Sequence, residues 1–185
     1  MVLYNTEKII KNNYKIIERA GASGQSVYYK CELIDSNKNN KKQYYFLKIY
    51  HDIDVQCIDD INLFFSNIIK KLKGYNNIFC LPVINKKREL EIGCEDNSIY
   101  IVFPWIDGST LTNYLKMGNL NNDQTKSIIL GLLSACTKLD EAGIIHLDIK
   151  PDNIFITESG DKTYIRIIDL DISKIYKPTE KNITV

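Results

Sequence analysis

The chain has 185 residues, of which 44% are hydrophobic and 25% charged, proportions that are ordinary for a folded globular protein. Its formal net charge of +1 gives no bulk electrostatic reason to expect nucleic acid or an anionic membrane as a partner. No apolar run is long enough to cross a bilayer, and the N-terminal residues lack the apolar stretch of a signal peptide. We therefore expect a cytoplasmic protein without membrane insertion and without a nucleic-acid partner.

The five cysteines form no CxxC pair, and the chain has only two histidines. A structural zinc site is therefore not expected. The cysteines are expected to be buried free thiols in a reducing compartment.

The first half of the chain predicts strands and one helix. Two runs rich in β-branched and aromatic residues, 26–34 and 43–50, flank the polar segment 35–42 and predict a β-hairpin with a long solvated loop. Apolar residues then recur by threes and fours over 58–72, which predicts an amphipathic helix.

The second half predicts further strands and a longer helix. The runs 78–84 and 98–105 are typical of strands, and 153–169 predicts a tight hairpin. A helix is expected over 123–142, ended by Gly143. The apolar stripe expected on this helix consists of Ile128, Ile129, Leu132, Leu133, Cys136 and Leu139. The order of elements predicts a two-lobed α+β protein with its seam near 104–108.

Polar residues gather in the segment GIIHLDIKPDNIFI, which is otherwise rich in branched aliphatic residues. Asp148 can accept a proton from a hydroxyl, and Lys150 can neutralise a phosphate. Asn153 offers an oxygen suited to a hard cation, and a second carboxylate, Asp169, follows the next strand. Positioning, charge neutralisation and a metal site are what phosphoryl transfer requires. A purely structural interpretation is that His146 and Asp148 hydrogen-bond a buried turn.

The segment HLDIKPDN resembles the protein-kinase catalytic loop H-R-D-L-x-x-x-N. By this resemblance the chain is identified as a eukaryotic-type (Hanks-type) serine/threonine protein kinase domain. The resemblance implies that Asp148 is the catalytic aspartate and that Lys150 stabilises the transferring phosphoryl group. It implies that Asn153 and Asp169 bind Mg²⁺, and that the cofactors are ATP and Mg²⁺.

Upstream segments extend the resemblance. RAGASGQSVYYKC is similar to the glycine-rich turn over the ATP phosphates, and YFLK resembles the third-strand Val-Ala-Ile-Lys. YIVFPWIDGSTLTNYL resembles the last N-lobe strand, the hinge and the first C-lobe helix. The implied nucleotide-binding residues are Gly21, Ser23, Gly24, Gln25, Ser26, Lys48, Phe103, Trp105 and Ile106.

The fold implied by the resemblance is a protein-kinase-like two-lobed α+β fold. An antiparallel N-lobe sheet plus one helix is expected in 1–104. The hinge and a truncated helical C-lobe are expected in 105–185.

Several positions depart from the kinase pattern. The helix has no glutamate near Ser66 or Asn67, where the partner of the lysine is expected, and Asp59 lies about 10 Å earlier along the helix axis. Phe46 stands where a small alanine normally touches adenine. Leu147 replaces the arginine that reads activation-loop phosphorylation.

The chain reaches Val185 shortly after Asp169, without the helices that complete a kinase C-lobe. We expect either a fragment of a longer protein or a minimal kinase. The minimal form resembles the short kinase-like effectors of some pathogenic bacteria, which are delivered into a host cytosol. In both cases apolar surface is expected to be exposed, which predicts a protein partner or a dimer.

Three functions are compatible with this pattern. The first is an ATP- and Mg²⁺-dependent serine/threonine protein kinase that acts on a protein substrate. The second is a pseudokinase-like binding module without turnover. The third is a small-molecule phosphotransferase of the aminoglycoside or choline kinase type, against which Lys150 and Pro151 argue, because that subclass usually lacks the lysine.

Overall fold

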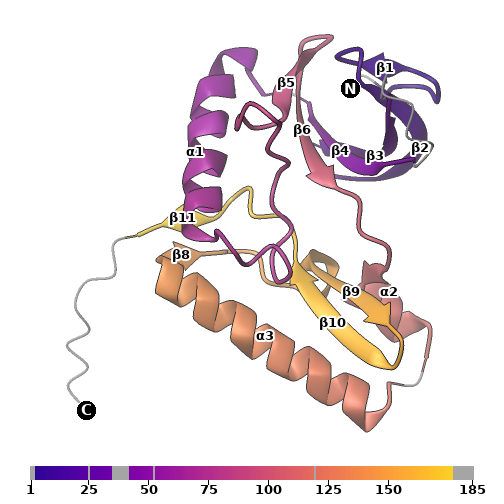
Figure 1. Ribbon diagram of the computed structural model, residues 1–185, viewed down its shortest axis with the longest axis vertical. Coiled ribbons are helices and arrows are strands. Elements are labelled where there is room, and N and C mark those ends of the chain that lie inside the picture. Colours follow the sequence, from indigo (N-terminus) through magenta and orange to yellow (C-terminus); the bar gives the residue numbers. More distant parts are fainter. Residues whose placement is uncertain (1–2, 25, 35–41, 52, 119, 177–185) are drawn as a thin grey trace. The chain divides into compact units, whose positions relative to one another are not determined.

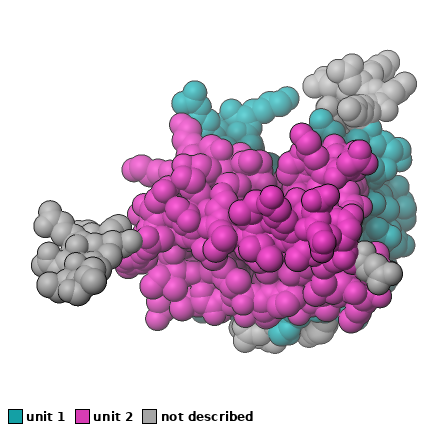
Figure 2. Space-filling model, turned by 90° about the horizontal axis from the view of Figure 1, so that it is seen from below, with its two compact units in different colours: residues 1–67, 81–105 teal, residues 68–80, 106–185 magenta. Residues whose placement is uncertain are grey.

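The computed structural model describes residues 3–24, 26–34, 42–51, 53–118 and 120–176. The chain divides into two compact units, which Figure 2 distinguishes by colour. The first unit comprises residues 1–67 and 81–105, and the second comprises 68–80 and 106–185. The expected lobe boundaries stay a prediction. Of the expected hairpin loop over 35–42, all but Lys42 lies outside the described residues.

The first unit is built on a curled six-stranded antiparallel sheet (Figure 1). Its strands lie in the order β1-β2-β3-β4-β6-β5, so β5 follows β6 at one edge. They are β1 (Ile9–Ile10), β2 (Tyr14–Ser23), β3 (Ser26–Leu33), β4 (Tyr44–Tyr50), β5 (Ile92–Glu95) and β6 (Ser98–Pro104). The hairpin expected over 26–34 and 43–50 is confirmed by the pairing of β3 with β4.

The two faces of this sheet differ because successive side chains of a strand point to opposite faces. One face forms a closed apolar core of buried residues: Ile10, Tyr14, Ile16, Val27, Tyr29, Cys31, Leu47, Ile49, Tyr100 and Val102. The other face carries the side chains that alternate with these. Its central rows are Tyr28, Lys48 and Ile101, and beside them Lys30, Phe46 and Phe103.

The expected strand over 78–84 is wrong. Only two isolated bridges involve this segment, Phe79 with Ile167 and Ile84 with Leu90. The strand next to β6 at this edge of the sheet is instead β5, which lies between the two runs 78–84 and 98–105. Phe79 and Leu81 are buried in the core without belonging to a strand, so the apolar run reflects burial and not strand pairing.

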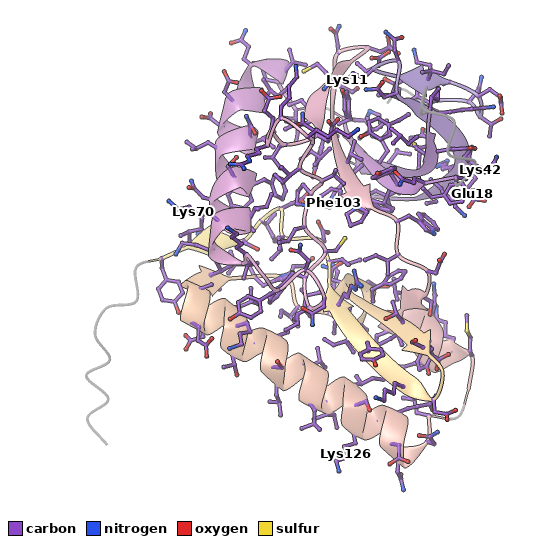
Figure 3. All side chains as sticks on the ribbon, viewed as in Figure 1. Lys11, Glu18, Lys42, Lys70, Phe103 and Lys126 are labelled. Atoms are coloured by element: carbon purple, nitrogen blue, oxygen red, sulfur yellow. The ribbon has the colours of Figure 1, made fainter. Side chains whose placement is uncertain are left out.

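The helix predicted over 58–72 is confirmed as α1 (Ile58–Lys71), which follows the short 3-10 turn η1 (Val55–Cys57). The side chain of Asp54 accepts a hydrogen bond from the Gln56 amide at the start of η1. Phe65 of α1 is fully buried, and its ring lies 6.3 Å from the Phe103 ring of β6. Figure 3 labels Phe103, and it also labels Lys70 near the end of α1.

The second unit combines two helices with two small sheets. The sheets have the strand orders β10-β9-β7 and β11-β8. The elements are β7 (Ser109–Thr110), α2 (Leu111–Lys116), α3 (Asn122–Ala142), β8 (Ile144–Ile145), the 3-10 turn η2 (Pro151–Asn153), β9 (Ile154–Ser159), β10 (Lys162–Ile167) and β11 (Lys174–Ile175). Both the helix expected over 123–142 and the hairpin after it are confirmed, and α3 runs beside this hairpin (Figure 1).

The apolar stripe expected on α3 is only partly correct. Ile128 and Leu139 are buried, but Ile129 and Leu133 are 51% and 60% exposed. The reason is that small residues form the contact face, since a Cβ added at Gly131 would lie 2.6 Å from Cγ1 of Ile165. The predicted stripe does not include Gly131, which lies on this contact face.

Large apolar side chains are exposed on the second unit, as expected. They include Ile129, Leu130, Leu133, Ile145, Leu147, Ile149, Ile172 and Ile175. The partner or dimer inferred from such exposure stays a prediction. Within the described residues, no helix is both long and apolar enough to cross a membrane.

Candidate active site

The segment that carries the polar cluster links β8 to β9 within the second unit. His146 is 3% exposed, and its Nδ1 accepts a hydrogen bond from the Asp148 amide at 3.3 Å. In the neutral imidazole Nε2 then carries the proton, and it donates to the carbonyl of Ile168 at 3.1 Å. Ser173 donates its hydroxyl to the carbonyl of His146 at 3.4 Å. His146 therefore fastens the segment of Asp148 to the segment that carries Asp169.

Asp148 lies between a cation and an amide. Its Oδ2 accepts hydrogen bonds from Lys150 Nζ at 2.7 Å and from Asn153 Nδ2 at 2.8 Å. The hydrogen bond from Lys150 is the main reason why the pKa of Asp148 lies below its ordinary value of 3.8. The same bond raises the pKa of Lys150, and the charge of Asp169 raises it further. The cluster therefore holds one carboxylate and one ammonium, both charged near neutral pH.

Asn153 and Asp169 are the expected metal ligands. Asn153 is 6% exposed, and its main-chain carbonyl accepts a hydrogen bond from the Ile168 amide at 3.0 Å. Asp169, which follows Ile168, is half-buried and has a left-handed backbone with φ of 63°. Since the amide nitrogen of Asn153 faces Asp148, its Oδ1 is left as the oxygen for a cation.

These donors suit Mg²⁺ rather than a metal held by protein ligands alone. The described residues contain no cluster of three or more His, Cys, Asp or Glu side chains that could hold a metal. Mg²⁺ is usually held by one or two protein oxygens together with phosphates and waters. A pair of oxygen donors, one amide and one carboxylate, fits this preference.

Leu147 stands where the kinase pattern has arginine. Its backbone is left-handed with φ of 69°, a conformation that costs about 1 kcal/mol in a residue other than glycine, and its side chain is 52% exposed. An apolar side chain cannot pair with a phosphate.

In the first unit, Lys48 lies in the middle of β4 and is only 6% exposed. Its Nζ lies 5.5 Å from the ring centroid of Tyr28 and 5.2 Å from that of Tyr50. Helix α1 has its only carboxylates in its first turn, on the exposed residues Asp59 and Asp60.

The expected glutamate position on α1 carries no acid. Ser66 and Asn67 are both exposed, whereas the buried side chain of Phe65 beside them contacts Phe103. The helix therefore presents an aromatic ring, and not a carboxylate, at its buried face.

Phe46 joins a row of aromatic rings on the same face of the sheet as Lys48. Its ring centroid lies 5.3 Å from that of Tyr28 and 6.3 Å from that of Phe103. Tyr28 is not among the nucleotide-binding residues predicted from the sequence. The signal was present, because Tyr28 occupies the position of valine in the glycine-rich pattern G-x-G-x-x-G-x-V.

The glycine-rich turn joins β2 to β3. Ser23 pairs with Ser26 across the turn, and Gly24 has φ of 43°, which favours glycine. The hydroxyl of Ser23 contacts the hydroxyl of Tyr28. Gln25 lies outside the described residues.

The expected hinge residues follow β6. Trp105 is half-buried, and Lys30 Nζ lies 4.5 Å from its ring centroid. Ile106 is also half-buried and is the first residue of the second unit after β6.

The fold of the chain is that of a kinase. It superposes on the crystal structure of a kinase domain with a TM-score of 0.73 at 16% identity, covering 97% of this chain and 57% of the other. The expected protein-kinase-like α+β fold is thereby confirmed. The protein kinase domain family matches residues 20–185, and the chain belongs to that family.

Relatives in sequence carry kinase names. A probable serine/threonine-protein kinase of Clostridium perfringens is 29% identical over 168 residues, which are 90% of this chain and 22% of that protein. The probable serine/threonine-protein kinase PknB of Lactococcus lactis is 34% identical over 90 residues, 48% of this chain and 14% of that protein. The chain thus spans about a fifth of the length of the Clostridium relative. The names support a transferase of the serine/threonine kinase class, and ATP binding is typical of the family.

Proposed function

We propose that the chain is a serine/threonine protein kinase that transfers the γ-phosphate of ATP to a protein hydroxyl. The supporting observation is the hydrogen-bonded cluster of Asp148, Lys150 and Asn153. Within one short segment it combines a carboxylate that can orient a hydroxyl, an ammonium that can neutralise phosphate charge and an amide whose oxygen can bind a cation, which are groups that phosphoryl transfer uses.

Asp148 orients the substrate hydroxyl and takes its proton. Its Oδ2 is engaged by Lys150 and Asn153, so Oδ1 accepts the hydrogen bond of the hydroxyl. Lys150 stabilises the negative charge on the transferring phosphoryl group. The hydrogen bond between Lys150 and Asp148 keeps the ammonium in place before the substrate arrives.

The first unit supplies groups that hold the nucleotide. The ammonium of Lys48 pairs with the α- and β-phosphates, and main-chain amides of the glycine-rich turn contact the phosphates. The proposed nucleotide-binding residues are Gly21, Ser23, Gly24, Gln25, Ser26, Lys48, Phe103, Trp105 and Ile106. Asn153 and Asp169 hold Mg²⁺, which when bound neutralises charge on the phosphates.

A transfer assay with labelled Mg-ATP tests this function. The chain is incubated with a generic basic protein and, separately, with hydroxylated small molecules such as an aminoglycoside and choline. The expected result is label on the protein as phosphoserine or phosphothreonine. Label on small molecules alone would identify a small-molecule phosphotransferase and contradict the proposed function.

A pseudokinase-like binding module without turnover is the second candidate. Two observations favour it: the aromatic rings of Tyr28 and Phe46 lie on the face of the sheet that carries Lys48, and the buried face of α1 presents no carboxylate. Such a module engages a protein partner, and it binds ATP without transferring phosphate in the assay above.

A further inference from the structure

We propose that the side chain of Tyr28 covers the Lys48 ammonium, and that a phosphate group reaches Lys48 only when this ring turns away. The cover is defined by contacts within the first unit. It rests on the proposed function only in taking ATP as the natural phosphate ligand.

The pairing of β3 with β4 places the two side chains together. Tyr28 lies directly opposite Lys48, and directly opposite residues of antiparallel strands share a face of the sheet. The Lys48 Nζ lies 5.5 Å from the Tyr28 ring centroid, within the range of a cation–π interaction. The ring of Tyr50 lies 5.2 Å from the same atom. Lys48 is 6% exposed, and both rings lie within cation–π range of its ammonium.

Further contacts fix the ring of Tyr28 over the glycine-rich turn. Its hydroxyl contacts that of Ser23, and its ring lies against Phe46 with the ring planes 34° apart. A Cβ added at Gly21 would lie 3.5 Å from Cδ2 of Tyr28. One side chain therefore touches the turn and the lysine that are expected to hold the phosphates.

A phosphate and the Tyr28 ring compete for the same ammonium. A phosphate oxygen pairs with an ammonium at about 2.7–2.9 Å, which requires direct access to Nζ. The ring offers a weaker attraction that does not need such close approach. The hydroxyl of Tyr28 contacts Ser23, which is exposed, so this end of the ring lies at the surface of the first unit. Valine, as in the family pattern, would leave Lys48 open from this side.

The test compares Tyr28→Val with Tyr44→Val. Tyr44 is a matched control on the neighbouring strand, because its ring also lies over a lysine, Lys30, at 4.9 Å. Tyr28→Phe keeps the ring and removes the hydroxyl, and it serves as a milder variant if Tyr28→Val is unstable. Two quantities are measured on each form: the rate at which a small acylating reagent labels Lys48, read by peptide mass spectrometry, and the dissociation constants of Mg-ATP and inorganic tripolyphosphate.

In Tyr28→Val, Lys48 is expected to be labelled several-fold faster than in the wild type. The variant should also bind Mg-ATP and tripolyphosphate about tenfold more tightly, which is the scale of a lost cation–π contact. Tyr28→Phe should release the ring from Ser23 and give a smaller change in the same direction. Tyr44→Val should match the wild type. Unchanged labelling in Tyr28→Val, or weaker binding of tripolyphosphate, would overturn the cover.

Failure of the proposed function has a different signature. If tripolyphosphate binding tightens in Tyr28→Val but neither form transfers phosphate from Mg-ATP, the covering of Lys48 by Tyr28 is supported and the proposed kinase activity is contradicted. If transfer occurs in the wild type and Tyr28→Val changes neither labelling nor affinity, the kinase stands and the cover is wrong.

Discussion

The amide nitrogen of Asn153 lies 2.8 Å from Oδ2 of Asp148 and 3.0 Å from the main-chain carbonyl oxygen of the same residue. One buried side chain thus fixes both the backbone and the carboxylate of Asp148. The position of the carboxylate is therefore set within the second unit itself, by residues close to it in sequence.

The pKa of Asp148 should respond to its two donors in a definite order. The hydrogen bond from Lys150 is the largest cause of the lowered pKa, and that from Asn153 is smaller. Lys150→Met should raise the pKa towards 3.8, and Asn153→Ala should raise it less. The sign follows because each change removes an interaction that favours the carboxylate. Carboxyl ¹³C NMR without divalent cations measures this titration.

In the wild type Asp148 stays ionised until the pH falls through its lowered pKa. The stabilisation of the folded state by its hydrogen bonds is therefore fully present above the ordinary pKa of 3.8 and is lost as the pH falls from there through the lowered pKa. Lys162→Met, an exposed change on β10, is the control. A larger shift in Asn153→Ala than in Lys150→Met would contradict the assigned order.

Gly108 should not tolerate alanine. It has φ of 150°, and an added Cβ would lie 2.1 Å from the carbonyl oxygen of Ile156, a backbone atom that cannot move aside easily. Gly108→Ala should lower the free energy of unfolding by about 3 kcal/mol. Gly160→Ala, at a turn with φ of 58° and open space, should cost about 1 kcal/mol. Equal losses in urea unfolding would argue against the close approach of β7 to β9.

The buried face of α3 can be tested with two leucines. Leu139 is 4% exposed, whereas Leu133 is 60% exposed. Leu139→Ala should lower the free energy of unfolding by about 2–5 kcal/mol, because it leaves a cavity. Leu133→Ala should change it by less than about 0.5 kcal/mol. Chemical denaturation of both variants distinguishes the observed face from the stripe expected from sequence.

The cysteines should fall into two classes. All five are free thiols, of which Cys57, Cys94 and Cys136 are exposed, so the expectation that all are buried is wrong. Burial raises the pKa of Cys31 and of Cys80 to about 12. At pH 8 a thiol reagent should modify three residues rapidly and these two slowly, and all five in denaturant. Rapid reaction at Cys31 in the folded protein would contradict its burial.

Sequence reasoning succeeded where chemistry depends on short spacings. His146, Asp148, Lys150 and Asn153 lie within eight positions, so local backbone geometry alone brings them together. The hairpin of β9 and β10 and both long helices were also predictable, since each has its own periodicity and turn residues.

The errors have a different physical origin. The segment 78–84 is apolar because it packs in a core, and periodicity cannot separate a buried irregular segment from a strand. The face of α3 depends on Gly131, whose missing side chain permits close packing on Ile165. Tyr28 was not predicted from the sequence because its position beside Lys48 depends on cross-strand pairing, which the sequence does not display directly.

The most direct test of the central claim compares Asp148→Asn with Asp152→Asn in the transfer of labelled γ-phosphate from Mg-ATP. Asp152 is an exposed neighbouring carboxylate and so controls for a change of local charge. Asp148→Asn is expected to abolish transfer while the affinity for Mg-ATP stays near that of the wild type, and Asp152→Asn should transfer normally. Full transfer by Asp148→Asn would contradict the assignment of Asp148 as the group that takes the proton of the substrate hydroxyl.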